Sequence, residues 1–507
     1  MYYPGQPDFL KLAGQGNLIP VTRRILADLE TPLSAYRKIR GQGESFLCES
    51  VEGGEHIGRY SFVGCNPRAV IKQIGPRVEL IENGKVVESF TVGLEAAGAG
   101  AAVKDGLVVV EQVMARYKPV AIPGLPRFSG GALGFIGYEF IHDIEPVVPR
   151  PPKDELNTPV MYFLIADELL VFDRVAQTIT VLVNAVLGER KPEEAYEEAV
   201  GEIERLVALL EQPSEHAPVD VPRETPEIHF TSNMTKEAFL QNVERAKKYI
   251  TAGDIIQVVG SQRFSTPVKA SPIDLYRAAR SINPSPYMFL LELDGFSLVG
   301  ASPELHVRCE GRRVEIRPIA GTYRRGQTPE EDIALGKALL ADPKERAEHV
   351  MLVDLARNDI GRVCDYGSVQ VKDLMIIERY SHVMHIVSQV EGRLSEGRTP
   401  YDLMRATFPN GTLSGAPKIR AMQIIAELEQ TARGPYGGCM GYFSFNGNLD
   451  CCITIRTALL KDGTAYVQAG GGWVNDSKPE AEFQETVNKA KAMLKAVAMA
   501  ENFSPAP

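Results

Sequence analysis

A proline-rich segment divides this chain into two parts of different character. Four prolines stand in the 14 residues PSEHAPVDVPRETP (213–226). Proline fixes φ and lacks a backbone N–H donor, so such a segment cannot continue a helix, and it is typical of an extended linker. Apolar residues at helical spacing predict a helix over 192–211 just before it. We therefore place a domain boundary near residue 225, between a first domain over 1–225 and a second over 226–507.

The two parts also differ in their predicted secondary structure. The first part is rich in β-branched and aromatic runs, which predict strands at 46–51, 61–64, 69–74, 78–90 (with a turn at Asn83-Gly84) and 169–186, and helices at 31–41 and 106–116. The second part predicts helices at 235–252, 272–282, 329–341, 343–358, 399–407, 416–430 and 479–500, and strands at 287–293, 296–300, 304–309, 313–317, 368–375, 440–446, 449–458 and 464–469. Strands in hairpin pairs, segregated from helices, favour the α+β class.

Composition and charge exclude several classes of protein. The 507 residues allow two large or three small domains, and 44% hydrophobic residues are enough for a sizeable core. A net charge of −10 disfavours nucleic-acid binding through a basic face. The seven cysteines are scattered without a CxxC pair, which favours a reducing, cytoplasmic compartment over a disulfide framework. We find neither a signal peptide nor an apolar run of membrane-spanning length.

Two predicted helices carry carboxylates on one face. Their starts are marked by Asp342-Pro343 and by Ser477-Lys478-Pro479-Glu480, which has capping-box spacing, as does Thr328-Pro329-Glu330-Glu331 before them. Glu345 and Glu348 share a face of one helix, and Glu482, Glu485 and Lys489 share a face of the other. Paired carboxylates suit Mg²⁺, although spacing alone favours a solvated acidic face.

Further candidates are compatible with an anionic ligand. Gly470 to Gly472 would let a backbone approach an anion, or form a plain turn. The segment GTLSGAPK (411–418) opens a predicted helix whose N-terminus could hold an anion. Arg456 alternates with apolar residues on a predicted strand and points either into a pocket or to solvent. His382 and His385 are three residues apart, a spacing that by itself favours histidines packed in the core over a metal site. The residues by themselves thus indicate an α+β protein that acts on an anion with Mg²⁺.

Nine segments in order along the chain resemble one family. They are GDIIQVVGSQRF (253–264), NPSPYMF (283–289), GASPELHV (300–307), RPIAGTYRRG (317–326), EHVMLVDLARNDIGRV (348–363), HVMHIVSQVEG (382–392), TLSGAPKIRAM (412–422), CITIRTAL (452–459) and AGGGWVNDSKPEAEFQETVNKA (469–490). Together they resemble the chorismate-utilising enzymes, and within them the large synthase subunits of anthranilate synthases. The similarity is dense over about residues 230–495. It implies antiparallel sheets in a sandwich-like core with helices outside, and a magnesium-dependent lyase.

The resemblance assigns roles to single residues. It implies that Glu348 and Glu485 hold Mg²⁺, with Glu345 and Glu482 next to them. Glu304 is similar to a general acid that protonates the departing C4 hydroxyl, a role that needs a carboxyl kept protonated by its surroundings. The groups expected around the enolpyruvyl carboxylate of chorismate are Arg456, Tyr436, Gly470, Gly471 and Gly472, with Thr322 and Lys489 completing the pocket and His385 orienting the enolpyruvyl group or assisting its loss.

Two positions favour ammonia as the nucleophile. Family members that add water carry a lysine base where this chain has Gln257, and a neutral amide cannot accept a proton from water. Aminodeoxychorismate synthases commonly carry a lysine where this chain has Ala320. Both differences favour formation of anthranilate and pyruvate over the products of isochorismate or aminodeoxychorismate synthases.

The resemblance also implies a partner and a regulator. The chain has no evident glutaminase module, so ammonia is expected from glutamine through a separate amidotransferase subunit, in a heterotetramer of two synthase and two amidotransferase subunits. A tryptophan-feedback site is implied at Glu49, Ser50, Arg59, Pro286, Tyr287 and Met288. The family's usual LLES is LCES here, with Cys48 in place of leucine. A non-catalytic tryptophan-binding regulator is the alternative from another functional class.

Overall fold

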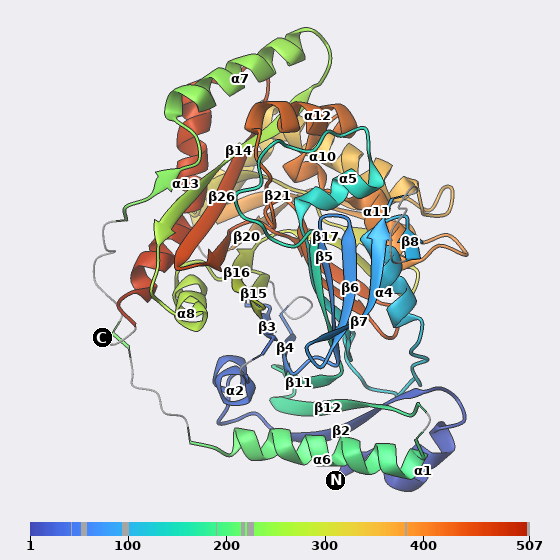
Figure 1. Ribbon diagram of the computed structural model, residues 1–507. Coiled ribbons are helices and arrows are strands. Elements are labelled where there is room, and N and C mark those ends of the chain that lie inside the picture. The colour runs from blue at the N-terminus through green and yellow to red at the C-terminus, as the bar shows by residue number, and fades with distance from the viewer. Residues whose placement is uncertain are drawn as a thin grey trace.

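Two large sheets dominate the computed structural model (Figure 1). It describes residues 1–41, 43–51, 58–93, 101–188, 190–213, 219–220, 228–380 and 383–503. Each sheet has 13 strands. Among the described strands, the β7–β8 pair alone is parallel; the other pairs are antiparallel. Helices lie outside the sheets, so the expected α+β architecture is confirmed.

Sheet 1 has the order β1-β2-β12-β11-β4-β3-β15-β16-β25-β26-β14-β13, with β22 paired to β14. Its strands are β1 (Tyr2–Tyr3), β2 (Leu18–Leu26), β12 (Thr178–Val186), β11 (Glu168–Asp173), β4 (Tyr60–Cys65), β3 (Ser45–Glu49), β15 (Tyr287–Leu293), β16 (Phe296–Ser302), β25 (Thr457–Lys461), β26 (Thr464–Trp473), β14 (Gln257–Pro267), β13 (Thr231–Ser232) and β22 (Gly415–Ala416).

Sheet 2 has the order β19-β21-β18-β17-β24-β23-β9-β10-β5-β6-β7-β8, with β20 paired to β21. Its strands are β19 (Ile319–Arg324), β21 (Val383–Arg393), β18 (Arg313–Ile316), β17 (Leu305–Glu310), β24 (Leu449–Ile453), β23 (Cys439–Ser444), β9 (Gly131–Ile136), β10 (Met161–Ala166), β5 (Ala69–Ile74), β6 (Arg77–Glu82), β7 (Lys85–Val92), β8 (Ala101–Val103) and β20 (Gln370–Arg379).

Both sheets take strands from both sides of the linker. In sheet 1, β3 pairs with β15 and places Glu49 opposite Met288. In sheet 2, β9 pairs with β23 and places Ile136 opposite Cys439. Most of the linker, and with it the boundary near residue 225, lies outside the described residues and stays a prediction. The sheets show that the two parts of the sequence share one framework.

The helices cover the outer faces of the sheets. The longer ones are α2 (Pro32–Ile39), α4 (Gly106–Met114), α6 (Pro192–Leu210), α7 (Lys236–Thr251), α8 (Pro272–Ile282), α9 (Pro329–Ala341), α10 (Pro343–Gly361), α11 (Pro400–Thr407), α12 (Lys418–Glu429) and α13 (Pro479–Ala500). Helix α13 packs on β26, and α10 packs on β19 and β21. These contacts hold the two glutamate-bearing helices against different sheets.

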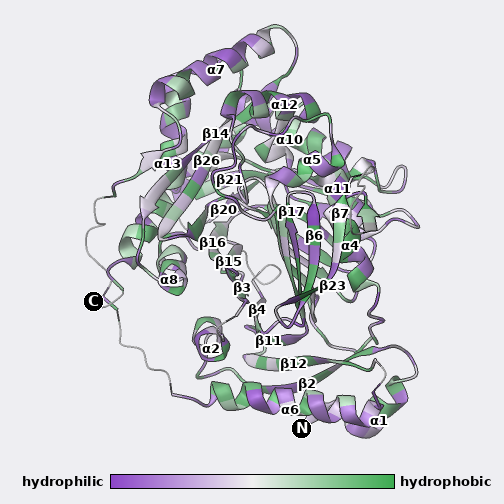
Figure 2. Cartoon of the chain, viewed as in Figure 1, coloured by the Kyte–Doolittle hydropathy of each residue, from purple (hydrophilic) through white to green (hydrophobic). Residues whose placement is uncertain are grey.

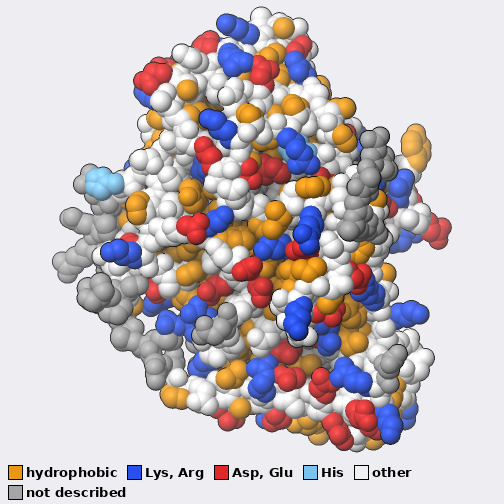
Figure 3. All heavy atoms as spheres, in the orientation of Figure 1, with side chains coloured by type: hydrophobic (Ala, Val, Ile, Leu, Met, Phe, Trp, Pro, Cys, Tyr) orange, Lys and Arg blue, Asp and Glu red, His pale blue; other side chains and the backbone are white. Residues whose placement is uncertain are grey.

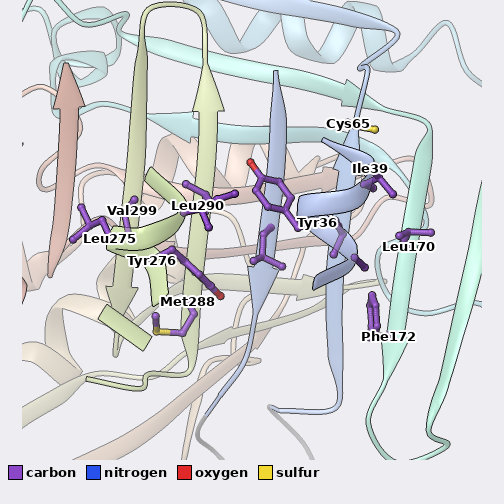
Figure 4. Packing of buried hydrophobic residues seen from close by; sticks show 14 of the residues in the cluster. Tyr36, Ile39, Cys65, Leu170, Phe172, Leu275, Tyr276, Met288, Leu290 and Val299 are labelled. Carbon is purple, nitrogen blue, oxygen red and sulfur yellow. The ribbon is translucent and has the colours of Figure 1, made fainter. Parts of the chain in front are cut away.

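The core is shared in the same way as the sheets. Figure 4 shows Tyr36, Ile39 and Leu170 from the first part beside Met288 and Leu290 from the second, all within one buried cluster. Hydrophobic and hydrophilic residues alternate around α6 (Figure 2), as its predicted amphipathic spacing requires. Within the described chain, no helix has the length and apolarity to cross a membrane. On the face in Figure 3, acidic and basic side chains are interspersed.

Two local predictions need correction. The run 169–186 forms two strands, β11 and β12, because residues 174–177 turn back between them. Ser477 does not cap α13; its hydroxyl accepts from Val474 N at 3.0 Å, and Lys478 occupies the N-cap position without a side-chain bond. Asp342, in contrast, caps α10 by accepting from the Lys344 and Glu345 N–H groups. The longer strands β2, β9, β10, β14, β19 and β21 were not predicted, because their sequences show no simple alternation of polar and apolar residues.

Candidate functional site

Helices α10 and α13 bring four glutamates to the ends of two glycine-containing strands. A Cβ on Gly471 of β26 would lie 3.2 Å from Glu482 Oε2 and 3.4 Å from Glu485 Oε1. A Cβ on Gly321 of β19 would lie 3.0 Å from Glu345 Oε2. The absence of a side chain at these two glycines is therefore what lets the carboxylates approach the sheets.

These carboxylates form an unfavourable arrangement by themselves. Burial raises the pKa of Glu348, and the neighbouring Glu345 and Glu485 carboxylates raise it further. Burial also raises the pKa of Glu345 and of Glu482. Glu482 Oε2 is buried and has no hydrogen-bond partner among the described residues. Such a cluster calls for a positive charge to offset it.

The donor set fits Mg²⁺ in a specific way. Among the described residues, no three His, Cys, Asp or Glu side chains converge as a ready-made cage. Mg²⁺, however, is usually held by one or two carboxylates together with water and substrate oxygens. Glu348 and Glu485 can supply two such carboxylates, and the orphaned Glu482 oxygen lies beside them.

Lys489 links the acidic cluster to the glycine strand. Its Nζ lies 2.7 Å from Glu485 Oε1 and donates to Gly470 O at 3.0 Å. The backbone oxygen of Lys489 accepts from Arg456 Nη1 at 3.3 Å. A lysine and an arginine therefore stand next to the glutamates, where they can meet the carboxylate groups of a ligand.

Arg456 lies in a break between strands, which corrects the prediction of one continuous strand over 449–458. Strand β24 ends at Ile453 and β25 begins at Thr457. Arg456 has φ 51°, a left-handed conformation that is strained for a residue with a Cβ. Burial lowers the pKa of its guanidinium, which nevertheless remains charged. Backbone strain of this kind is common where a side chain must be aimed at a ligand.

Gly470, Gly471 and Gly472 continue strand β26 and do not form the turn considered above. They pair with Ser261, Gly260 and Val259 of β14. A Cβ on Gly470 would lie 2.7 Å from the Tyr436 hydroxyl, and one on Gly472 would lie 2.1 Å from Gln257 Nε2. Each glycine thus gives room to a different predicted site residue.

Glu304 is a buried carboxyl between β16 and β17. Its side chain is 4% exposed, and burial raises its pKa to about 8, well above the ordinary value of 4.5. The Thr412 hydroxyl donates to Glu304 Oε1 at 2.8 Å. A carboxyl in this environment keeps its proton near neutral pH and can act as a general acid.

His385 and Thr322 face each other across β21 and β19. His385 Nδ1 lies 2.9 Å from Gly321 O and 3.2 Å from Thr322 Oγ1. Because a carbonyl oxygen only accepts, Nδ1 carries the proton and Nε2 keeps a free lone pair in the neutral ring. Burial, followed by the Arg456 charge, lowers the pKa of His385 and favours this neutral form.

A separate cavity lies where β3 meets β15. Five of the six residues of the expected feedback site line it: Glu49, Ser50, Pro286, Tyr287 and Met288. Cys48 lines the cavity as well. Ser50 Oγ is buried without a hydrogen-bond partner among the described residues. Arg59 is not among the described residues that line the cavity; its guanidinium instead pairs with Asp173 at 2.8 Å.

Several residues that line this cavity or contact its Glu49 escaped the sequence reasoning. Glu49 is 3% exposed and accepts from the Tyr276 hydroxyl at 2.6 Å, and Arg280 Nε lies 3.2 Å from it. Tyr276 and Arg280 stand four apart on α8, a spacing that identifies a shared face but not what the face meets. Tyr442 of β23 and Asp450 of β24 also line the cavity and carry no local signal.

Known proteins of one family match this chain over almost its whole length. Residues 88–495 match the model of the chorismate binding enzyme family. Anthranilate synthase component 1 of Acetivibrio thermocellus is 47% identical over 502 residues, covering 98% of this chain and 99% of that protein. The Pseudomonas putida protein of the same name is 48% identical over 503 residues, covering 98% and 99%.

Solved structures agree. Anthranilate synthase component I from Streptococcus pneumoniae superposes with a TM-score of 0.76 at 38% identity, covering 93% of this chain and 99% of that one. The menaquinone-specific isochorismate synthase of Escherichia coli, at 18% identity, has a TM-score of 0.67 over 97% and 98% of the two chains, which shows a shared fold only.

Proposed function

The chain belongs to the chorismate binding enzyme family, among the anthranilate synthase component 1 proteins, and from this premise we propose how its site works. The chain converts chorismate and ammonia to anthranilate and pyruvate, as the synthase subunit of the anthranilate synthase of tryptophan biosynthesis. Ammonia adds at C2, the C4 hydroxyl leaves, and loss of the enolpyruvyl group as pyruvate allows the ring to become aromatic.

The protonated Glu304 carboxyl carries this proposal. A hydroxyl is a poor leaving group unless a proton reaches it as the bond breaks. Burial raises the pKa of Glu304 to about 8, so its proton is retained at neutral pH. The hydrogen bond from Thr412 holds Glu304 Oε1 in place, so the carboxyl is oriented as well as protonated.

Two different groups of residues bind the two carboxylates of chorismate. Arg456, Lys489, Tyr436 and the backbone of Gly470 to Gly472 receive the enolpyruvyl carboxylate. Glu348 and Glu485 would hold Mg²⁺, with Glu345 and Glu482 beside them. The ion would offset the glutamate charges and supply a positive partner for the ring carboxylate. His385, with Nδ1–H bonded to Gly321 O, presents its Nε2 to the enolpyruvyl group.

Ammonia rather than water is the nucleophile. Gln257 is 4% exposed and lies against Gly472, where a base that activates water would stand. An amide cannot take a proton from water, whereas ammonia already carries a lone pair. Ala320 likewise offers no amine. The nitrogen source is glutamine, acted on by a separate amidotransferase subunit, in an assembly of two subunits of each kind.

The cavity between β3 and β15 binds tryptophan as a feedback inhibitor. Its apolar walls suit an indole, and the Glu49 carboxylate and the unpartnered Ser50 hydroxyl suit an ammonium group. Cys48, smaller than leucine, leaves more room beside the ring.

The test is direct assay of the purified chain with chorismate, Mg²⁺ and ammonium at about pH 8, where more of the ammonium is present as ammonia than at neutral pH and part of Glu304 keeps its proton. We expect the fluorescence of anthranilate to rise with time and to depend on both chorismate and Mg²⁺. Isochorismate or 4-amino-4-deoxychorismate as the product would overturn the proposal, and so would tryptophan binding without turnover.

A further inference from the structure

A buried ion pair lies beneath the proposed chorismate site. Arg433 and Glu429 are four residues apart at the end of α12, and their side chains are 1% and 3% exposed. Arg433 Nη2 donates to Glu429 Oε1 at 2.7 Å, and Nε donates to Oε2 at 2.9 Å. Burying two charges carries a large desolvation cost, so such a pair is weak evidence for stability alone.

The arginine connects two backbone segments that carry site residues. Arg433 Nη2 donates to Val259 O at 2.7 Å, two residues beyond Gln257 on β14. Nη1 donates to Leu413 O at 2.8 Å. Leu413 directly follows Thr412, whose hydroxyl bonds Glu304. One guanidinium therefore fixes the Gln257 strand and the Thr412 turn relative to each other.

The glutamate connects a third segment, the glycine strand. Glu429 Oε1 accepts from Ser261 N at 2.8 Å and from Ser261 Oγ at 2.9 Å. Ser261 lies opposite Gly470 in the register of β14 and β26. The pair thus also fixes the position of β14 next to Gly470 of β26, whose backbone is proposed to bind the enolpyruvyl carboxylate.

The ring of Tyr436 rests on the same arginine. The guanidinium carbon lies 5.6 Å from the Tyr436 ring centroid and 4.5 Å from that of Tyr138. Arg433 and Tyr436 lie in the loop between α12 and β23. Glu139 holds this loop, because its carboxylate accepts hydrogen bonds from Arg433 N at 2.8 Å and from Gly434 N at 2.9 Å. Tyr138 and Glu139 come from the first part of the sequence, so both parts hold this loop.

We propose that the Glu429–Arg433 pair is a positioning device for the chorismate side of the site. It fixes Gln257, the Thr412–Glu304 contact and Tyr436 relative to one another without touching substrate. Among the described residues, the side-chain hydrogen bonds of the pair reach β14, Leu413 and each other, and none reaches α10 or α13. The pair therefore makes no direct hydrogen bond to the two helices that carry the proposed magnesium ligands. This inference rests on the proposed function.

Arginine is needed here because of its shape. Its planar fork presents donors at fixed angles to Glu429, Val259 O and Leu413 O together. A lysine keeps the charge but concentrates its donors on one flexible nitrogen, so it cannot bond all three acceptors in the same geometry. Misplacement of reacting groups by about 1 Å can cost about 100-fold in rate.

The experiment compares Arg433→Lys with Arg405→Lys in the full chain. Arg405 makes a matched bidentate pair with the fully buried Asp105, at 2.8 and 2.9 Å, and touches no proposed site residue. For Arg433→Lys we expect the KM for chorismate to rise at least about tenfold, while the Mg²⁺ concentration for half-activation stays within about twofold. Arg405→Lys lowers the unfolding midpoint but leaves both constants unchanged.

Glu429→Gln provides a second variant. Glutamine keeps the volume and one acceptor for Ser261 but removes the charge, so KM for chorismate rises in the same direction by a smaller factor. Unchanged KM in both folded variants overturns the inference, as does an equal rise in Arg405→Lys or a failure of both variants to fold. A wild-type chain that makes no anthranilate instead contradicts the proposed function.

Discussion

At the scale of single residues, the protonation of Glu304 gives a pH dependence with a definite sign. Its pKa is raised to about 8 by burial, so the acid form is present below that pH and is lost as the pH rises through it. We expect kcat, measured under saturating chorismate and ammonia, to decline above about pH 8. Replacing Glu304 by glutamine should remove this decline and lower kcat by about 10²- to 10⁴-fold.

The matched control for Glu304→Gln is Thr412→Val. Valine keeps the shape of threonine but removes the hydroxyl that donates to Glu304 Oε1. Since that hydrogen bond stabilises the ionised carboxyl, its loss should move the alkaline limb of the pH profile upward while turnover persists. A wild-type profile that stays flat from pH 7 to 9 would remove Glu304 from the role of acid.

A second prediction at this scale concerns Ser50 in the cavity between β3 and β15. Ser50→Phe should fill the cavity and relieve inhibition by tryptophan, with turnover in its absence within about twofold of wild type, because the cavity is separate from the catalytic groups. Inhibition curves for the wild type and the variant measure this. Ser50→Ala removes the unpartnered hydroxyl without filling the space, so it should weaken inhibition less. Full inhibition of a folded Ser50→Phe chain would place the tryptophan site elsewhere.

At the scale of elements, α13 carries both a proposed metal ligand, Glu485, and a carboxylate that is not proposed to bind the metal, Glu480. Glu485→Gln should raise the Mg²⁺ concentration for half-activation by about 10- to 100-fold, since it removes a proposed ligand beside Lys489. Glu480→Gln removes the same charge at an exposed position in the first turn, so it should leave the metal dependence unchanged. Titration of activity with Mg²⁺ distinguishes the two. Equal effects would mean that general electrostatics, not ligation, sets the metal dependence.

The helices also show which local sequence signals are sufficient to predict where an element begins. Pro343 and Pro479 stand at the first positions of α10 and α13, as predicted, because proline is already shaped for that position. Strand ends were less predictable. The break before β25 gives Arg456 a left-handed backbone, and that break depends on Ala301 N bonding to Arg456 O at 3.1 Å from another strand.

At the scale of the whole molecule, the shared sheets predict the effect of cutting the linker. A protease site placed between residues 213 and 228 should allow cleavage without separation of the two pieces, because β3–β15 and β9–β23 join them. Gel filtration after cleavage should show both pieces in one peak with activity retained. Each piece expressed alone should aggregate, since it would expose long unpaired strand edges. Separation of folded pieces would instead show two independent domains.

The sequence by itself determined the class of fold, most helices and the residue types of the site. Proline and capping residues act locally, and helical spacing of apolar residues reports burial within one element, so these features are legible without a structure. The ordered motifs were sufficient for the family, which the relatives then showed.

Only the tertiary structure decided which residues meet. The Glu429–Arg433 pair bonds Val259 and Leu413, and Glu304 gains its raised pKa from burial and accepts a hydrogen bond from Thr412, 108 residues away in the sequence. Arg59 turns to Asp173 and leaves the cavity that its neighbours line. Desolvation and hydrogen bonding depend on distances across the fold, and no local pattern in the chain encodes those distances.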